Sequence, residues 1–180
     1  MNTTKFGHTI TGLIIGLLLQ ASVYAQFTFE KHYAGPSIGF SFLGSTFQFG
    51  GNYEYGIRIE NFGNIGIGGV LRYWDYRENF TGGKWSYTNI LVGVQGNYHF
   101  EILGNEQFDP YAGIVLAYDG GSVSYSGPVR NSTIPPHGGL WVGAQGGIRY
   151  WFNPNLAVTG RVGFGNLSYG ALELGVDLKF

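Results

Sequence analysis

The chain of 180 residues contains no cysteine and few charged residues. The absence of cysteine excludes disulfide frameworks and thiolate metal sites. Charged residues make up 12% of the chain, about half of the roughly 25% found in soluble domains, which disfavours an ordinary cytosolic surface. The formal net charge of -1 offers no basic footprint, so we expect no nucleic-acid partner.

Long apolar runs are missing after the first 25 residues. A membrane-spanning helix needs about 20 consecutive apolar residues, whereas later runs are as short as Ile90-Leu91-Val92. The chain is instead rich in glycine, with 32 residues, and 17% of it is aromatic. The glycines show no three-residue period, which excludes collagen. This composition favours β-structure and excludes a bundle of membrane helices.

The first segment has the features of an export signal. Lys5 and His8 precede the apolar stretch 10–19, and Val23-Tyr24-Ala25 offers a cleavage site. An N-terminal membrane anchor is the alternative, but the apolar stretch is too short to span a bilayer. We therefore expect a signal peptide over residues 1–25, cleaved after Ala25, and a single domain over residues 26–180.

Apolar and polar residues alternate along most of the remaining chain. From Phe47 to Ile59 the odd positions are apolar, aromatic or glycine, and the even positions are polar or glycine. Such alternation is typical of strands with two different faces. Five segments show it clearly and three more weakly, which predicts eight strands. The predicted strands cover residues 34–43, 47–60, 64–75, 89–100, 110–119, 140–152, 156–164 and 171–180.

The predicted connections alternate between compact turns and longer segments. Turns at 61–64, 102–108 and 153–155 alternate with connections that include the two long segments 76–86 and 120–138. Transmembrane barrels place short turns in the periplasm and long loops outside, and an even strand number leaves both chain ends on the periplasmic side. The pattern predicts an all-β fold, an eight-stranded antiparallel up-and-down transmembrane β-barrel.

Several features together resemble the small outer-membrane β-barrels of the OmpA/OmpX type, also described as porin-family barrels. These features are the export signal, eight amphipathic strands, the segment 146–152 before Asn153-Pro154-Asn155, and the last strand. The family's last strand ends in an aromatic residue preceded by alternating apolar residues, which the barrel-assembly machinery recognises. The residues that match this assembly signal are Leu172, Leu174, Val176, Leu178 and Phe180.

The resemblance implies an integral, multi-pass protein of the Gram-negative outer membrane, part of the cell envelope. Its implied partners are outer-membrane lipid, lipopolysaccharide and the barrel-assembly machinery, and we expect a monomer. Family membership does not settle activity, because such barrels serve as adhesins, envelope stabilisers, enzymes and narrow pores.

The polar faces of the predicted strands would fill the barrel lumen. An eight-stranded barrel is just wide enough for its own side chains, so we expect these groups to pair with one another. The register of the last hairpin predicts one ion pair, Arg161 with Glu173. A path for polar solutes or protons is the alternative. The predicted lumen network comprises Glu54, Arg58, Arg72, Gln95, His99, Gln145, Arg149, Arg161, Glu173 and Asp177.

The sequence predicts no catalytic, cofactor or metal site. The histidines after the signal, His32, His99 and His137, have no serine or carboxylate at the spacing of a recognised catalytic motif. No group of His, Asp and Glu shows metal-ligand spacing. We therefore expect a protein that is not an enzyme and carries no cofactor.

Aromatic residues are predicted to form girdles at the two membrane boundaries. Trp74 and Trp141 fall on the inward face near the loop end, where they either plug the mouth or stack on a sugar; we favour the plug. The predicted periplasmic girdle contains Tyr98, Phe100, Tyr150, Phe152 and Phe180, and the outer girdle contains Tyr73, Tyr118, Phe164 and Tyr169.

Three functions remain open from the sequence. The preferred one is a structural or adhesin-like surface-interaction protein whose exposed loops 76–86 and 120–138 carry Arg77, Lys84 and Arg130 and bind a surface ligand. The alternative is a narrow pore for small solutes or ions. A soluble exported barrel with a lipophilic ligand is the third, and it would turn the charged face outward.

Overall fold

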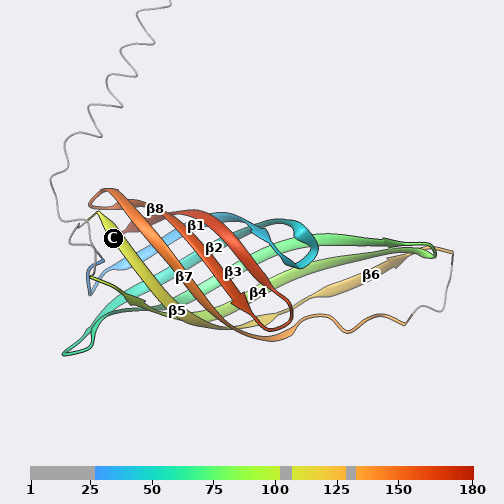
Figure 1. Ribbon diagram of the computed structural model, residues 1–180, viewed down its shortest axis with the longest axis horizontal. Coiled ribbons are helices and arrows are strands. Elements are labelled where there is room, and N and C mark those ends of the chain that lie inside the picture. Colours follow the sequence, from blue (N-terminus) through green and yellow to red (C-terminus); the bar gives the residue numbers. More distant parts are fainter. Residues whose placement is uncertain (1–26, 102–106, 129–132) are drawn as a thin grey trace, which may run out of the picture.

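A computed structural model describes residues 27–101, 107–128 and 133–180 (Figure 1). The predicted signal peptide, its cleavage site and Arg130 lie outside these residues. The elements in chain order are β1 (His32–Ser41), the 3-10 turn η1 (Leu43–Ser45), β2 (Thr46–Ile59), β3 (Gly63–Phe80), β4 (Gly83–His99), β5 (Phe108–Asp119), β6 (Ser122–Ser126), β7 (Gly139–Asn153), β8 (Leu156–Gly165) and β9 (Gly170–Lys179).

Eight of the nine strands close into a barrel. Each strand from β1 to β5 and from β7 to β9 is antiparallel to its neighbours, and β1 pairs with β9 to close the ring. Beyond the last strand, Phe180 exchanges two backbone hydrogen bonds with His32, of 2.9 and 3.0 Å, across this seam. The prediction of an eight-stranded up-and-down barrel is confirmed. No helix among the described residues has the length and apolar character needed to span a membrane.

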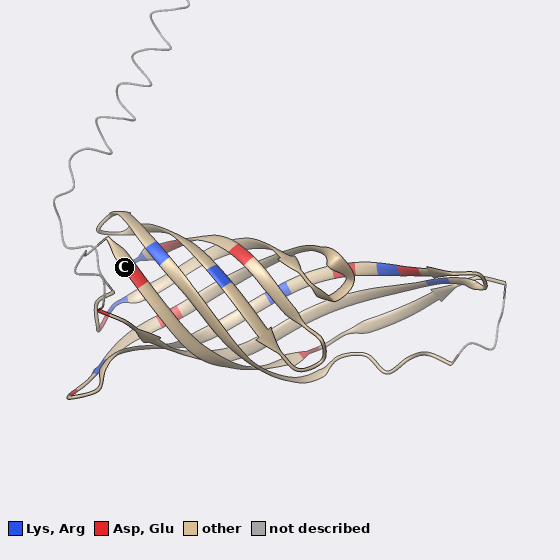
Figure 2. Cartoon of the chain, viewed as in Figure 1, with Lys and Arg blue, Asp and Glu red and all other residues tan. Residues whose placement is uncertain are grey.

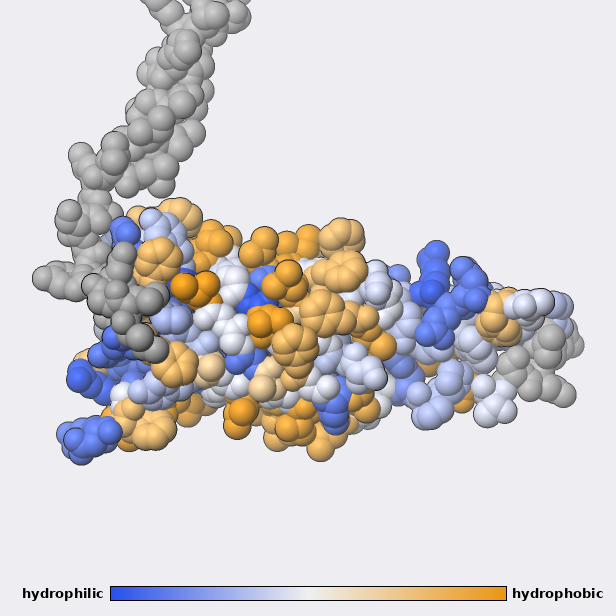
Figure 3. Space-filling model, in the orientation of Figure 1, coloured by the Kyte–Doolittle hydropathy of each residue, from blue (hydrophilic) through white to orange (hydrophobic). Residues whose placement is uncertain are grey.

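The barrel is apolar outside and polar inside. Outward side chains such as Ile114 and Leu174 are 72% and 62% exposed, and apolar atoms cover much of the side wall in Figure 3. In contrast, Glu54, Arg161 and Glu173 are buried within the barrel. A soluble barrel with its charges outside is therefore excluded, and the distribution is that of a barrel surrounded by lipid.

The two long connections differ from the prediction of exposed loops. Residues 76–86 belong to β3 and β4, which run on beyond the barrel and turn at Thr81-Gly82. The segment 120–138 contains β6, which continues the ladder of β5 along β4. Together, residues 75–80, 83–88 and 122–126 form a three-stranded sheet that projects from the barrel (Figure 1). We call this sheet the blade.

The blade lies at the end of the barrel opposite to the C-terminus (Figure 1). Barrels of this kind keep short turns on the periplasmic side and longer extensions outside. We therefore refer to the end with the C-terminus as the periplasmic end and to the blade end as the extracellular end.

The lipid-facing position of Leu174 can be tested with a matched pair of substitutions. Leu174→Arg places a cation near the middle of the outer wall and should lower the free energy of unfolding by about 2–4 kcal/mol, whereas Leu178→Arg near the periplasmic boundary should cost about 0–1 kcal/mol. Urea titrations of the barrel in lipid vesicles measure both. Equal losses at the two positions would contradict the orientation.

Candidate functional site

The extracellular half of the lumen is built around one carboxylate, that of Glu173. Arg161 lies directly opposite Glu173 in the β8–β9 register, and its Nε donates to Glu173 Oε2 at 2.7 Å. Arg72 from β3 binds the same carboxylate through Nε and, at 2.9 Å, through Nη2. Asn52 Oδ1 accepts from both guanidiniums at 2.7 Å, and Gln48 donates to Glu173. The predicted pair Arg161–Glu173 is confirmed, and the structure adds a second guanidinium.

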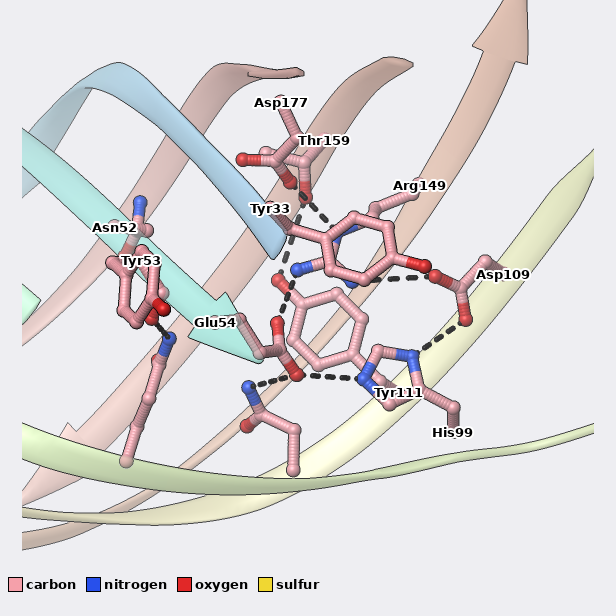
Figure 4. Close-up of polar contacts among 12 residues, drawn as sticks. Tyr33, Asn52, Tyr53, Glu54, His99, Asp109, Tyr111, Arg149, Thr159 and Asp177 are labelled. Carbon is pink, nitrogen blue, oxygen red and sulfur yellow. Dashed lines mark hydrogen bonds and ion pairs between the residues drawn. The ribbon is translucent and has the colours of Figure 1, made fainter. Parts of the chain in front are cut away.

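The periplasmic half is built around Arg149 (Figure 4). Its guanidinium contacts three carboxylates: Glu54, Asp109 at 3.3 Å, and Asp177 at 2.7 Å. His99 lies between two of these carboxylates, with Nε2 at 2.7 Å from Glu54 and Nδ1 at 2.7 Å from Asp109. Only the doubly protonated imidazole can donate to both. Two ionised carboxylates at these distances favour the charged form of His99.

Amide side chains fill the space between the two charged clusters. Gln145 Nε2 donates to Gln95 Oε1 at 2.8 Å and to Asn97 Oδ1 at 2.7 Å. Asn97 in turn donates to Glu54 at 3.3 Å, which links the amides to the periplasmic cluster. These side chains thus form a polar column along the barrel, in which the amides link the two charged clusters.

The charges of the two clusters balance when His99 is protonated. In the two clusters four carboxylates face three guanidiniums and His99, and all of these side chains are buried; a fifth buried carboxylate, Asp119, lies outside the clusters at the extracellular end of β5. Because an unpaired charge in a barrel interior is costly, this balance is a condition for folding. The carboxylates are those of Glu54, Asp109, Glu173 and Asp177, and the guanidiniums are those of Arg72, Arg149 and Arg161.

Two residues differ from the predicted lumen network. Arg58 is exposed at the periplasmic end of β2, where its guanidinium lies 5.6 Å from the centre of the Phe29 ring. It does not join the network, because β2 extends past the end of the packed lumen at this point. Asp109 was missed because the predicted strand started at Pro110. Its spacing of two from Tyr111, which also points inward, was the available signal. The other nine predicted residues are buried inside the barrel.

Inward-facing glycines make room for the charged side chains. A Cβ on Gly66 would overlap the carboxylate of Glu54, and one on Gly50 would lie 2.6 Å from Cδ of Arg72. Glycines on the lipid face behave differently, since a Cβ on Gly96 would meet no heavy atom within 4 Å. The small inward positions that could suggest a water path are therefore occupied by neighbouring side chains.

Aromatic side chains close the extracellular mouth. Trp74 and Trp141 are 1% and 4% exposed, and Tyr169 packs on both, at ring-centre distances of 4.4 and 5.4 Å. The predicted plug is confirmed for both tryptophans. The placement of Tyr169 in the outer girdle was wrong. Tyr169 is an even number of residues from Glu173 and points into the barrel as Glu173 does, and its hydroxyl donates to Gln48 at 2.7 Å. A cavity of about 30 Å³ lies beneath this plug, room for only one or two waters.

The periplasmic mouth is closed by a residue that precedes the first strand. The ring of Phe27 stacks on His99 at a centre distance of 3.5 Å and on Tyr33 at 4.8 Å. Phe27 also packs with Trp151 and Ala157 in a buried cluster. Both ends of the polar column are thus covered by aromatic rings.

The described residues contain no group of three or more His, Asp or Glu side chains arranged to hold a metal ion. The contacts of His99 are both to carboxylates, so its ring has no nitrogen left to activate a nucleophile. The arrangement of the lumen is that of a packed polar core whose two charged clusters are internally paired.

The structural role of the inward glycines predicts different effects for the same substitution. Gly66→Ala should lower the free energy of unfolding by about 1–3 kcal/mol, because the added methyl overpacks the lumen beside Glu54. Gly96→Ala on the lipid face is the matched control and should change it by less than about 0.5 kcal/mol. Urea unfolding in lipid vesicles compares the two, and similar losses would contradict the packed lumen.

The double contact of Glu173 predicts an order among substitutions. Glu173→Ala leaves two guanidiniums facing each other and should cost about 3–5 kcal/mol. Arg161→Ala should cost less, because Arg72 still neutralises Glu173. The double variant should cost less than the sum of the two losses, since it removes one of the unpaired cations. Additive losses in the same unfolding assay would show that the side chains do not interact.

No protein-family model and no curated protein sequence matches the chain. Solved structures do match. The outer membrane protein OprG from Pseudomonas aeruginosa aligns at 12% identity with a TM-score of 0.59, over 88% of this chain and 99% of that one. The N-terminal β-barrel domain of OprF from the same organism aligns at 16% identity with a TM-score of 0.55, over 84% and 98%.

A third similar structure is Ail, the attachment invasion locus protein of Yersinia pestis, at 13% identity with a TM-score of 0.52, over 85% of this chain and 100% of that one. At these identities the likeness is one of fold, and it extends over the full barrel. With its closed ring of eight strands, its apolar outer wall and its polar interior, the chain has the fold of the small eight-stranded outer-membrane β-barrels.

Proposed function

We propose that this protein is a non-conducting outer-membrane barrel that displays the blade as a surface for binding partners outside the cell. The observation that carries the proposal is the projection of three paired strands beyond a barrel whose own interior is filled. Extended structure outside the membrane is where a barrel of this size can offer contact area.

The packing of the lumen argues against the pore. Ion pairs and amides occupy the column, and the cavity of about 30 Å³ is lined by Trp141 and Tyr169 from the aromatic plug and by Arg72 and Arg161 from the charged cluster. Eight-stranded barrels have interiors that side chains can fill. The alternative of a narrow pore would require both the aromatic plugs and the charged clusters to rearrange.

The blade presents charged and hydroxyl groups that suit contact with a partner. Its strands carry Asp75, Arg77 and Glu78 on β3 and Lys84 on β4, which Figure 2 shows as coloured bands beyond the barrel. Its backbone is held by β3–β4 pairing up to Phe80 and Gly83. The sheet is therefore ordered before a partner binds, so binding costs little free energy for ordering it. The name of the similar protein Ail, attachment invasion locus protein, is compatible with such a role.

The last strand supports recognition by the barrel-assembly machinery. Leu172, Leu174, Val176 and Leu178 point outward from β9, and Phe180 follows them with 65% exposure. Lipid and lipopolysaccharide would contact this same outer wall. The absence of a paired nucleophile and base in the described lumen supports a role other than catalysis.

Removing the blade should separate binding from folding. The variant joins Asp75 to Thr88 through an Asn-Gly turn and replaces residues 121–137 by a short Gly/Ser linker, which leaves the barrel ladders intact. We expect normal heat-modifiable gel mobility, negligible conductance in planar bilayers for both proteins, and at least about a tenfold loss of adhesion to cultured epithelial cells by bacteria that express the variant.

Two outcomes would contradict this proposal. Steady conductance of the purified wild-type barrel, altered by Arg72→Gln and insensitive to blade removal, would favour the pore. Unchanged adhesion after blade removal would show that another surface binds the partner, or that the barrel has a purely structural role.

A further inference from the structure

The two faces of the blade differ in chemistry. Register pairs place Tyr76 beside Tyr87 and Val123, and Glu78 beside Trp85 and Tyr125, all on one face. The rows between them place Arg77 beside Ser86 and Ser124, and Asn79 beside Lys84 and Ser126, on the opposite face. The aromatic rings in register with Tyr76 and Glu78 thus lie on one side of the sheet, and the cations Arg77 and Lys84 lie on the other.

The base of the aromatic face is covered, but its tip is not. Tyr76 and Tyr87 stack at a ring-centre distance of 4.5 Å, and His137 packs on Tyr87 at 4.9 Å. Both tyrosines are buried, and burial raises the pKa of Tyr76 to about 12. Further out, Trp85 and Tyr125 are only partly buried and Phe80 is 47% exposed.

Three rings form a continuous platform at this tip. The Trp85 and Tyr125 rings lie 4.9 Å apart, and Phe80 lies 6.4 Å from Trp85 and 6.1 Å from Tyr125. The Tyr125 hydroxyl donates to the carbonyl of Gly82 at 2.6 Å, which fixes this ring against the hairpin turn. The platform is therefore held in place before any ligand arrives.

A carboxylate lies at the edge of the platform. Glu78 is in the same row as Trp85 and Tyr125, and its Oε2 accepts from the Tyr87 hydroxyl at 3.1 Å. Its other oxygen has no hydrogen bond within the described ranges of the chain. The side chain is exposed, so this negative charge is available to a ligand on the rings.

Aromatic faces beside a carboxylate attract organic cations, because the electron-rich ring faces and the carboxylate both favour positive charge. A primary ammonium group needs acceptors for three N–H donors, and the platform offers one unpaired carboxylate oxygen. A quaternary ammonium group has no N–H donors and presents methyl groups to the rings. Charge therefore selects a cation, and the quaternary group is favoured among cations because it has no N–H donors to satisfy and presents methyl groups to the rings.

We propose that the Phe80–Trp85–Tyr125 platform with Glu78 binds a quaternary ammonium group of the choline type. This inference rests on the proposed function, since it names the chemistry of the partner that the blade meets. The site lies on the aromatic face, away from Arg77 and Lys84, whose charges would repel the cation.

The test uses the whole barrel in maltoside micelles, which contain no quaternary ammonium group. Choline chloride is titrated while the Trp85 indole resonance, assigned with Trp85→Phe, is followed by proton–nitrogen NMR. We expect a saturable shift with a Kd in the millimolar range. The neutral carbon isostere of choline, 3,3-dimethylbutan-1-ol, should bind at least about tenfold more weakly, because it lacks the charge.

Variants separate the platform from the rest of the blade. Glu78→Gln and Tyr125→Leu should each weaken choline binding by at least about fivefold, and Lys84→Gln on the opposite face is the control that should leave it within about twofold. Heat-modifiable gel mobility confirms that each barrel is folded.

Several outcomes would overturn the inference. The first two are the absence of a saturable shift and binding of the neutral isostere as tight as that of choline. The others are equally tight binding of lysine amide, which carries a primary ammonium group, and choline binding that is insensitive to both platform variants. Loss of adhesion on blade removal together with any of these results would leave the proposed function standing and reject only this ligand.

Discussion

The pairing of charges inside a narrow barrel is the constraint on which the rest of the structure depends. The outer wall faces lipid, so every charged group in a spanning strand must find its counter-charge in the lumen. Glu173 and Arg149 each meet this need by binding several partners from different strands. The contacts that neutralise charge also join strands across the lumen. Those of Glu173 join β3, β8 and β9, and those of Arg149 join β2, β5, β7 and β9. The same side-chain contacts therefore provide both charge neutralisation and cohesion of the closed barrel.

Glycine placement follows from this constraint. Guanidinium and carboxylate groups are too large to share an eight-stranded lumen with side chains at every inward position. Gly50 and Gly66 leave the volume that Arg72 and Glu54 occupy. Part of the high glycine content is therefore a steric complement of the buried charges, and it does not indicate an open channel.

Much of the barrel could be predicted from residue alternation, because one face of each strand meets lipid and the other meets polar groups. The same parity, together with the turn of the last hairpin, located the Arg161–Glu173 pair. Parity failed at the strand ends. It included Arg58, which lies past the packed lumen, and it omitted Asp109, which precedes Pro110, the predicted start of the strand.

The blade was not predicted for a related reason. Residues 75–88 are rich in polar residues and contain the turn at Thr81-Gly82, so they resemble a loop in composition, although Tyr76, Trp85 and Tyr87 keep the alternation of a strand. β6 is short and rich in serine, and it is defined by its pairing with β4, which a local pattern does not contain. The roles of Gln48 and Asn52 as polar partners of the charged groups could not be predicted either, because they depend on contacts across the lumen.

The continuity of β3 and β4 from the barrel into the blade has a mechanical consequence. β3 is 18 residues long, about 60 Å at the usual rise per residue, and no flexible joint separates its outer end from the membrane. A pull on the tip acts along the strands, while the hydrogen bonds between β3 and β4 run across them. Both arms of the hairpin are pulled in the same direction, so the load travels as tension along their backbones and reaches the β2–β3 and β4–β5 ladders of the barrel in shear, where many hydrogen bonds share it.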